Sequence, residues 1–243
     1  MLGLTTWFTI GTLGMLVGTA MLAYGLTLVP TERRRQLGLA TVVPAIAAVA
    51  YGLMALGFGG LTTADGATVF VPRYVDWLLT TPIHVAVIAL VVGASTKLIA
   101  RLATLQALTI VFGFVGATLG SPLNWALYLV GSACFAGVVY LLFTDCEALA
   151  DDSADDVAAL FRKLRSFVVV LWLVYPVIWL LAPAAIGAMD TETTALVVTY
   201  IDVVAKVGFG LIVINDFASM AAASDEVADV EASIGDGPNA TAD

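Results

Sequence analysis

The sequence predicts an all-α membrane protein that folds as one bundle of seven transmembrane helices. Two observations lead to this prediction. The 243 residues are 60% hydrophobic and 12% charged, and the mean hydropathy of +1.00 is far above that of water-soluble domains. A hydrocarbon layer of roughly 30 Å needs about 20 apolar residues per helix, and segments of that length follow one another along the chain: 5–27, 37–58, 70–93, 99–119, 123–143, 164–186 and 194–216.

The first segment is expected to be a retained helix rather than a cleaved signal. No basic residue precedes it, and the first charge in the chain is Glu32. The second segment contains Pro44 and the third contains Pro82, and each proline removes a backbone hydrogen bond and permits a bend. The fourth segment follows Lys97, and the turn "GSPLN" separates it from the fifth.

The last three segments carry the features that matter most for function. The fifth contains Cys134 and is followed by Cys146, but these cysteines lack metal-ligand spacing and plausible mutual geometry, so we expect no redox chemistry and no metal. The sixth begins with "FRKLRS" and contains Pro176. A tilt about this proline would move a polar end, although a static kink fits the sequence equally well. The seventh carries Asp202 and Lys206.

The distribution of basic residues predicts the topology. Eight of the ten fall in alternate connections, which should therefore face the cytoplasm and place the N-terminus outside and the C-terminus inside. The eight are Arg33, Arg34, Arg35, Lys97, Arg101, Arg162, Lys163 and Arg165.

Most of the 19 acidic residues lie in "DCEALADDSADD" and in "SDEVADVEASIGDG". We interpret them as a solvated surface, which excludes nucleic acid as a partner and suits a high-salt cytoplasm. The sequence thus divides into a membrane domain, 1–218, and an acidic cytoplasmic tail, 219–243, which we expect to be disordered.

Few ionisable residues remain at membrane depth, and such residues usually mark function. Arg73, Asp76 and His84 lie on the third segment, and Asp202 and Lys206 lie on the seventh. Asp202 and Lys206 share one helix face at i,i+4. Two cations and two anions sum to zero, the arrangement that best survives burial. Such a cluster could also have a purely structural role, as ion pairs that hold helices together.

The surroundings of Lys206 favour a chemical role over a purely structural one. Gly208 and Gly210 thin the helix just beyond it, and aromatic residues crowd the third and sixth segments. A desolvated amine is suited to condense with an aldehyde. The sequence therefore predicts a Schiff base at Lys206.

Three segments in this order resemble microbial rhodopsins of the haloarchaeal group: "RYVDWLLTTP" at 73–82, "WLVYPVIWLLAP" at 172–183 and "YIDVVAKVGFG" at 200–210. Similarity extends through "LGMLVGTAMLAYG" and "PAIAAVAYGLMALG", so it covers essentially the whole membrane portion. The resemblance implies the seven-helix fold of microbial (type 1) rhodopsins and a photoprotein of the cell membrane rather than an enzyme.

The resemblance also implies the cofactor and the roles of the site residues. All-trans retinal would be bound as a protonated Schiff base on Lys206, with Asp76 as counterion and proton acceptor, Asp202 as second counterion and Arg73 balancing both. Aromatic and hydroxyl residues would complete the site. Trp77, Trp172, Tyr175 and Trp179 would enclose the polyene, Tyr51 and Tyr74 would hydrogen-bond near the counterions, and Thr80 and Thr81 would lie beside Asp76.

The choice between sensor and pump depends on one position. Proton pumps of this family normally carry a carboxylate about three turns beyond the acceptor, and here that place is Val87. Without this donor the deprotonated intermediate should last long, which suits signalling. The sequence is thus most similar to sensory rhodopsin II and the middle rhodopsins, and it predicts a phototaxis receptor. A weak light-driven outward proton pump and a retinal-free transporter or scaffold are the alternatives.

Two residues depart from the sensory pattern. Ala205 precedes the lysine where sensory members have a hydroxyl residue coupled with Tyr175, which favours the middle group and puts the usual route to a transducer in doubt. His84 lies one turn beyond Thr80, where relatives usually have an apolar residue. It is either a satisfied core histidine or a group that tunes retinal or passes a proton to the Schiff base.

The expected partners follow from this interpretation. The lipid bilayer surrounds the bundle, and a two-helix methyl-accepting transducer would bind along the sixth and seventh helices. Small residues on several helices permit a homo-oligomer without specifying its size.

Overall fold

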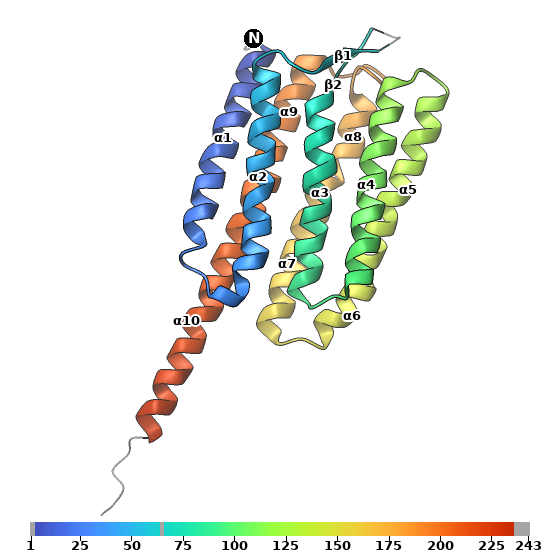
Figure 1. The fold of residues 1–243 in the computed structure, drawn as a ribbon. Helices are drawn as coiled ribbons and strands as arrows, with labels where there is room; N and C mark the ends of the chain where they lie inside the picture. Colours follow the sequence, from blue (N-terminus) through green and yellow to red (C-terminus); the bar gives the residue numbers. More distant parts are fainter. Residues whose placement is uncertain (1–2, 64–65, 236–243) are drawn as a thin grey trace, which may run out of the picture.

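The computed structural model describes residues 3–63 and 66–235, with side chains described as far as residue 224. Seven helical rods stand side by side (Figure 1), and within the described residues seven spans are long and apolar enough to cross a membrane. The predicted fold class is thereby confirmed. Two rods are divided into shorter helices, because α7 continues as α8 and α9 continues through the turn η2 into α10.

The first five long helices begin and end within about three residues of the predicted segments, whereas the sixth rod begins at Asp155 rather than at residue 164 and the seventh continues to Gly235 rather than to residue 216. The first half of the bundle comprises α1 (Leu4–Gly25), α2 (Arg34–Ala55), α3 (Val71–Val91) and α4 (Thr96–Thr118). The second half comprises α5 (Leu123–Phe143), the short α6 (Asp145–Asp151), α7 (Asp155–Trp172), α8 (Val174–Leu181), α9 (Thr191–Val203) and α10 (Phe209–Gly235). Helices suit the apolar core of a bilayer because every backbone hydrogen bond closes within the segment.

A small β-hairpin lies at the end of the bundle that holds the N-terminus (Figure 1). Strands β1 (Gly60–Thr62) and β2 (Thr68–Phe70) pair antiparallel, with Leu61 opposite Val69. No strand was predicted between the second and third segments. Gly59 permits the entry to the hairpin, because its φ of +80° is a left-handed conformation that favours glycine.

Pro176 divides the sixth rod. Proline at this position cannot donate to the carbonyl of Trp172, four residues earlier, and its ring crowds that carbonyl. Accordingly α7 ends at Trp172 and α8 begins at Val174. Pro44 and Pro82 lie inside the continuous helices α2 and α3, so proline divides a helix at only one of the three predicted places in the described chain.

The seventh rod contains a wide turn. Residues Val204–Gly208 form η2, a π-helical turn that carries Lys206. Single π turns inside α-helices occur frequently at functional sites. The sequence predicts one regular helix here and gives no sign of the wide turn.

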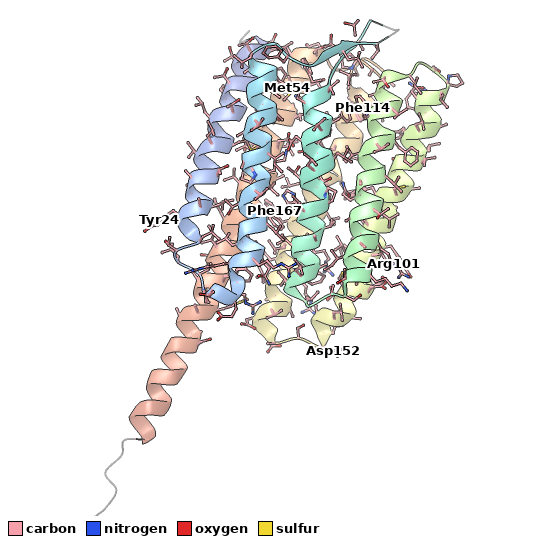
Figure 2. All side chains as sticks on the ribbon, in the orientation of Figure 1. Tyr24, Met54, Arg101, Phe114, Asp152 and Phe167 are labelled. Atoms are coloured by element: carbon pink, nitrogen blue, oxygen red, sulfur yellow. The ribbon has the colours of Figure 1, made fainter. Side chains whose placement is uncertain are left out.

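The outer face of the bundle is apolar. Tyr24 is 67% exposed and points away from the bundle (Figure 2), and Leu16 and Val17 of the same helix are also exposed. The interior is closely packed instead. At Gly18 an added Cβ would lie 2.2 Å from Cγ2 of Val207, so a glycine is needed where α1 meets the lysine-bearing rod.

Helix α10 extends well beyond the bundle, at the end opposite the hairpin (Figure 1). It continues to Gly235, so residues 219–235 are helical where a disordered tail was predicted, and the boundary at 218 marks no change of secondary structure. Alanine, which is frequent in this stretch, favours helix. The remainder of the predicted tail, 236–243, lies outside the described residues.

The predicted basic connections all lie at this same end of the bundle (Figure 2 labels Arg101). Ion pairs join them to neighbouring helices, as Arg162 of α7 contacts Glu147 and Asp151 of α6, and Lys163 contacts Asp216 of α10 at 2.6 Å. Arg165 also pairs with Glu147, and its guanidinium lies 3.9 Å from the ring centroid of Phe143. These contacts hold the charged end of α7 between α6 and α10.

Candidate functional site

The amine of Lys206 lies in the interior of the bundle between two carboxylates. Its Nζ is 2.5 Å from Oδ2 of Asp76 on α3 and 3.5 Å from Oδ2 of Asp202 on α9. All three side chains are at most 3% exposed. Helix spacing explains half of this arrangement, because Asp202 and Lys206 share a face at i,i+4. The predicted meeting of the third and seventh rods supplies the other half.

Three donors from three helices hold Asp202. Tyr51 of α2 donates to Oδ2 at 2.7 Å, Tyr175 of α8 donates to Oδ1 at 2.6 Å, and Nε1 of Trp77 on α3 lies 3.1 Å from Oδ1. Hydrogen bonds to an ionised carboxylate favour the charged form. Asp202 is therefore a junction between helices that are far apart in sequence.

Asp76 has fewer partners. Besides the amine of Lys206, its Oδ1 accepts a hydrogen bond of 3.2 Å from Thr80, whose hydroxyl also donates to the backbone carbonyl of Asp76 at 2.8 Å. The charge of Asp76 thus depends mainly on a positive Lys206. If that nitrogen gave up its proton, Asp76 is the carboxylate with the weaker competing interactions and the shorter distance.

Arg73 is buried near this group but does not join it. The structure describes no ion pair between the guanidinium of Arg73 and either Asp76 or Asp202. Of the four charges predicted to form one cluster, Lys206 contacts the two carboxylates, and Arg73 only lies nearby. Its Cζ lies 5.6 Å from the ring centroids of Phe8 and Phe70. Cation–π contacts of this kind compensate part of the cost of burial. Arg73 lies on α3, closer to the hairpin than Asp76.

A cavity of about 190 Å³ adjoins Lys206. Its wall is mostly apolar and aromatic and is built from α3, α4, α5, α7, α8 and the lysine-bearing rod. The structure places most of the predicted site residues on it: Arg73, Tyr74, Trp77, Thr81, His84, Trp172, Tyr175, Trp179, Asp202 and Lys206.

Aromatic neighbours fix the orientation of this wall. Trp77 packs edge-on against Tyr175 with 5.2 Å between centroids, and Trp179 stacks on Tyr128 of α5 at 4.8 Å. Tyr128 was not among the predicted residues, because an aromatic residue in an apolar helix gives no signal that distinguishes a cavity wall from a lipid-facing surface.

The expected role of Tyr74 is not supported by its position. Its ring packs against Trp77 at 5.4 Å and against Phe114 at 5.0 Å. Among the hydrogen bonds of the described residues, none joins Tyr74 to Asp76 or Asp202. Tyr51 alone of the two predicted tyrosines makes that contact, and Gly11 makes room for it, because an added Cβ there would lie 2.4 Å from Cδ1 of Tyr51.

Gln106 of α4 is a polar residue that the sequence analysis missed. It is 2% exposed, and its Nε2 donates to Oγ1 of Thr81 at 3.1 Å, while Thr81 donates to the carbonyl of Trp77 at 2.7 Å. A lone amide in the apolar segment 99–119 was the available signal. The contact fixes the hydroxyl of Thr81, so α3 and α4 are joined by a polar link on the cavity wall.

His84 lies on the other side of Lys206 from Asp202. Nδ1 of its imidazole is 2.9 Å from the carbonyl of Thr80, and its ring packs edge-on against Phe209 at 4.7 Å and Trp172 at 5.8 Å. Val87, one turn further along α3, is fully buried among apolar side chains. Ala205 is buried directly before the lysine.

The class of protein is defined by a seven-helix bundle that holds a buried lysine, two acidic partners and an adjoining aromatic cavity. A family model described as "Bacteriorhodopsin-like protein" matches residues 2–220. Sensory rhodopsin-2 of Haloarcula vallismortis is 53% identical over 234 residues, which cover 96% of this chain and 99% of that protein. Sensory rhodopsin-2 of Natronomonas pharaonis is 37% identical, covering 91% of this chain and 92% of that protein.

Solved structures agree with these similarities. The crystal structure of the thermophilic rhodopsin from Rubrobacter xylanophilus matches with a TM-score of 0.84 and 32% identity, covering 89% of this chain and 99% of that chain. The protein belongs to the bacteriorhodopsin-like family and is a multi-pass membrane protein. This confirms the resemblance on which the sequence analysis relied.

Proposed function

We propose that this protein is a retinal-based photoreceptor of the sensory rhodopsin II type, with retinal attached to Lys206. The observation that carries the proposal is the position of Lys206, whose amine is buried, paired with two carboxylates and adjacent to an apolar cavity. The two other lysines, Lys97 and Lys163, lie at the charged end of the bundle. The similarity to sensory rhodopsins over nearly the full length supports the same function.

The residues on the cavity wall fit retinal, which is a long apolar polyene ending in an aldehyde. Trp77, Trp172 and Trp179 present large apolar surfaces, while Lys206 offers the nucleophile that an aldehyde needs. Bound there as a protonated Schiff base, all-trans retinal would supply the absorption of visible light.

The protein's own contribution is to hold and move one proton. In the dark Asp76 and Asp202 stabilise a positive charge at the nitrogen of Lys206, since two buried anions face it. After illumination the proton moves from that nitrogen to Asp76. Asp202 keeps its charge, because its oxygens accept hydrogen bonds from Tyr51, Tyr175 and Trp77.

The proposed output is a signal rather than transport. Val87 stands where an internal carboxylate donor would return the proton, so the deprotonated state lasts long enough to be sensed. We place the N-terminus outside the cell and the charged end of the bundle in the cytoplasm, because basic connections favour that side. A membrane transducer beside α7 to α10 is the proposed receiver. A light-driven outward proton pump is the second candidate, since Asp76 and Ala205 match the pump pattern.

Attachment at Lys206 is tested by reductive fixation. The purified protein is reconstituted with all-trans retinal, reduced with borohydride under illumination, digested and examined by mass spectrometry. Retinyl should appear on the peptide that contains Lys206. Lys206→Ala should form no visible pigment, whereas Lys163→Ala, which removes an exposed lysine, should bind retinal normally. Retinyl at another lysine would end the proposal.

Flash photolysis with and without azide separates sensor from pump. Azide carries protons into the interior and should speed recovery greatly if an efficient internal donor is lacking. Cells that express the sensor should acidify their medium only weakly under continuous light. Recovery within milliseconds that is indifferent to azide, together with sustained acidification, would favour the pump.

A further inference from the structure

The imidazole of His84 is a buried titratable group that the proposed function does not use. It is 1% exposed and lines the same cavity as Lys206. The ring is held by Trp172 of α7 on one side and Phe209 of α10 on another, so it has little freedom to rotate. His84 is also the single histidine in the chain.

The hydrogen bonds of the ring determine which nitrogen carries the proton. Nδ1 faces the carbonyl of Thr80, which can only accept, so Nδ1 must be the donor. In a neutral imidazole Nε2 is then a bare acceptor. Nε2 is buried and has no hydrogen-bond partner among the described residues. The lone pair of Nε2 is therefore free to take up a proton.

Nε2 faces the lysine-bearing rod. Because Nδ1 is bound to α3's own backbone, the opposite edge of the ring points away from α3, and Phe209 of the lysine-bearing rod packs against the ring at 4.7 Å. Nε2 lies on that opposite edge, so it is the ring nitrogen that can exchange a proton.

The position along the bundle also matters. His84 lies eight residues beyond Asp76 on α3, which is roughly 12 Å along the axis at 1.5 Å per residue. It thus lies toward the charged end, while both acids lie toward the hairpin. Between His84 and that end the interior is apolar, and Val85, Val87 and Ile88 are fully buried. Among the buried charged side chains of the described chain, Arg165 lies on this side, and Glu147 pairs with it.

We propose that His84 is the proton-relay residue that returns a proton to the nitrogen of Lys206; this inference rests on the proposed function. After that nitrogen has given its proton to Asp76, Nε2 takes up a proton from a hydronium ion, which leaves water. The new N–H bond then breaks as the proton moves to the lone pair of the lysine nitrogen. Histidine returns to the neutral state, and no electron is gained or lost.

Electrostatics sets the order of these steps. Lys206 lines the same cavity as His84 and is paired with Asp76 and Asp202, whereas α7 and α10 contribute the uncharged Trp172 and Phe209. While Lys206 is positive, a second cation beside it is disfavoured in a medium of low dielectric constant. Once the lysine nitrogen is neutral, that repulsion disappears. His84 thus takes up a proton only after the nitrogen of Lys206 has become neutral and can accept it.

The first test examines the dark protein by nitrogen NMR. Because the chain has one histidine, labelling with 15N-histidine gives signals from His84 alone. In the full-length pigment in lipid membranes we expect a neutral ring with its proton on Nδ1 at neutral pH. An imidazolium in the dark, or a ring protonated on Nε2, would overturn the proposal.

The second test measures recovery after a flash. His84→Leu should slow recovery at least about tenfold, since positioned acids and bases typically contribute 10²–10⁴-fold. His84→Glu, which keeps a titratable group, should recover faster than His84→Leu, and azide should bring the two variants and the original protein to similar rates. Ile83→Leu, a volume-conserving change in the neighbouring position, is the control and should leave the rate unchanged.

The outcomes separate this inference from the proposed function. If His84→Leu forms pigment, cycles and recovers at the original rate, the relay is wrong and the photoreceptor stands. The relay is also wrong if recovery slows but neither glutamate nor azide restores it, because that result indicates a packing role. Failure of the original protein to form pigment would end the photoreceptor proposal itself.

Discussion

Oδ2 of Asp76 lies 2.5 Å from Nζ of Lys206, although the two residues are 130 positions apart, while Asp202 on the lysine's own rod lies 3.5 Å away. The more distant acid has the better set of hydrogen-bond donors. This asymmetry gives the two carboxylates different tasks. Asp202 is stabilised as an anion by neighbouring side chains, and Asp76 is stabilised chiefly by the charge that light is expected to displace.

Asp76→Asn should abolish proton release from Lys206. The amide cannot take the proton, and Asp202 alone is left to balance the cation. Because a negative charge near the nitrogen stabilises the dark state of the pigment, its loss should move the absorption maximum to longer wavelength. Visible spectra and flash photolysis measure both effects. An unshifted spectrum with a normal yield of the deprotonated intermediate would contradict the assignment.

Tyr175→Phe should destabilise the folded protein. The hydroxyl donates to a charged carboxylate at 2.6 Å, and hydrogen bonds to charged groups contribute about 1.5–3 kcal/mol. Loss of this contact should lower the midpoint of thermal bleaching. Tyr128→Phe is a suitable control, because its hydroxyl lies 3.4 Å from the carbonyl of Pro176 and should matter less. Equal effects of the two substitutions would argue against the role given to Asp202.

Gly11→Ala should disturb the site from a distance. The new Cβ would lie 2.4 Å from Cδ1 of Tyr51, and the ring cannot move away without losing its hydrogen bond to Asp202. Overpacking of this kind typically costs about 1–3 kcal/mol. We expect a lower bleaching temperature and an altered absorption maximum.

Gly38→Ala is the matched control for this effect. Gly38 also lies in a helix, but nothing lies within 4 Å of a Cβ added there. The substitution should leave the spectrum unchanged. If Gly11→Ala behaves in the same way, the tight contact between α1 and Tyr51 does not constrain the site.

Asp190→Ala should destabilise α9 in a pH-dependent way. The carboxylate of Asp190 accepts the backbone N–H of Thr193 at 2.6 Å, and this contact lowers the pKa of Asp190 below its usual value of 3.8. Because the folded-state pKa is the lower one, the stabilisation is present above pH 3.8 and is lost as the pH falls through the folded-state pKa. Bleaching temperatures of the two proteins should differ at neutral pH and converge in acid.

The most informative residues could be identified from sequence because charge is rare in apolar segments. Lys206, Asp76 and Asp202 could be singled out before any geometry was known, and helical spacing placed two of them on one face. The fate of Arg73 could not be predicted in this way. A long side chain can extend toward either end of a helix, and only the packing of Phe8 and Phe70 decides that it extends toward the hairpin.

Backbone irregularities were harder to predict than the rods themselves. The π turn at Lys206 spans only Val204–Gly208, and the apolar residues on either side of it continue the helical pattern, so periodicity does not reveal it. Of Pro44, Pro82 and Pro176, the prolines expected to permit a bend, only Pro176 coincides with a division of its rod. Proline removes the same hydrogen bond at all three positions, and the tertiary neighbours determine whether the helix stays continuous.

Helix α10 begins directly after the π turn and comprises 27 residues, or about 40 Å at 1.5 Å per residue. A pivot at the π turn would therefore lie at one end of a long helix. A rotation of about 5° at this turn would displace the far end of α10 by about 3.5 Å over that length. A change of angle too small to disturb the buried contacts would therefore become a sizeable displacement at the protruding end.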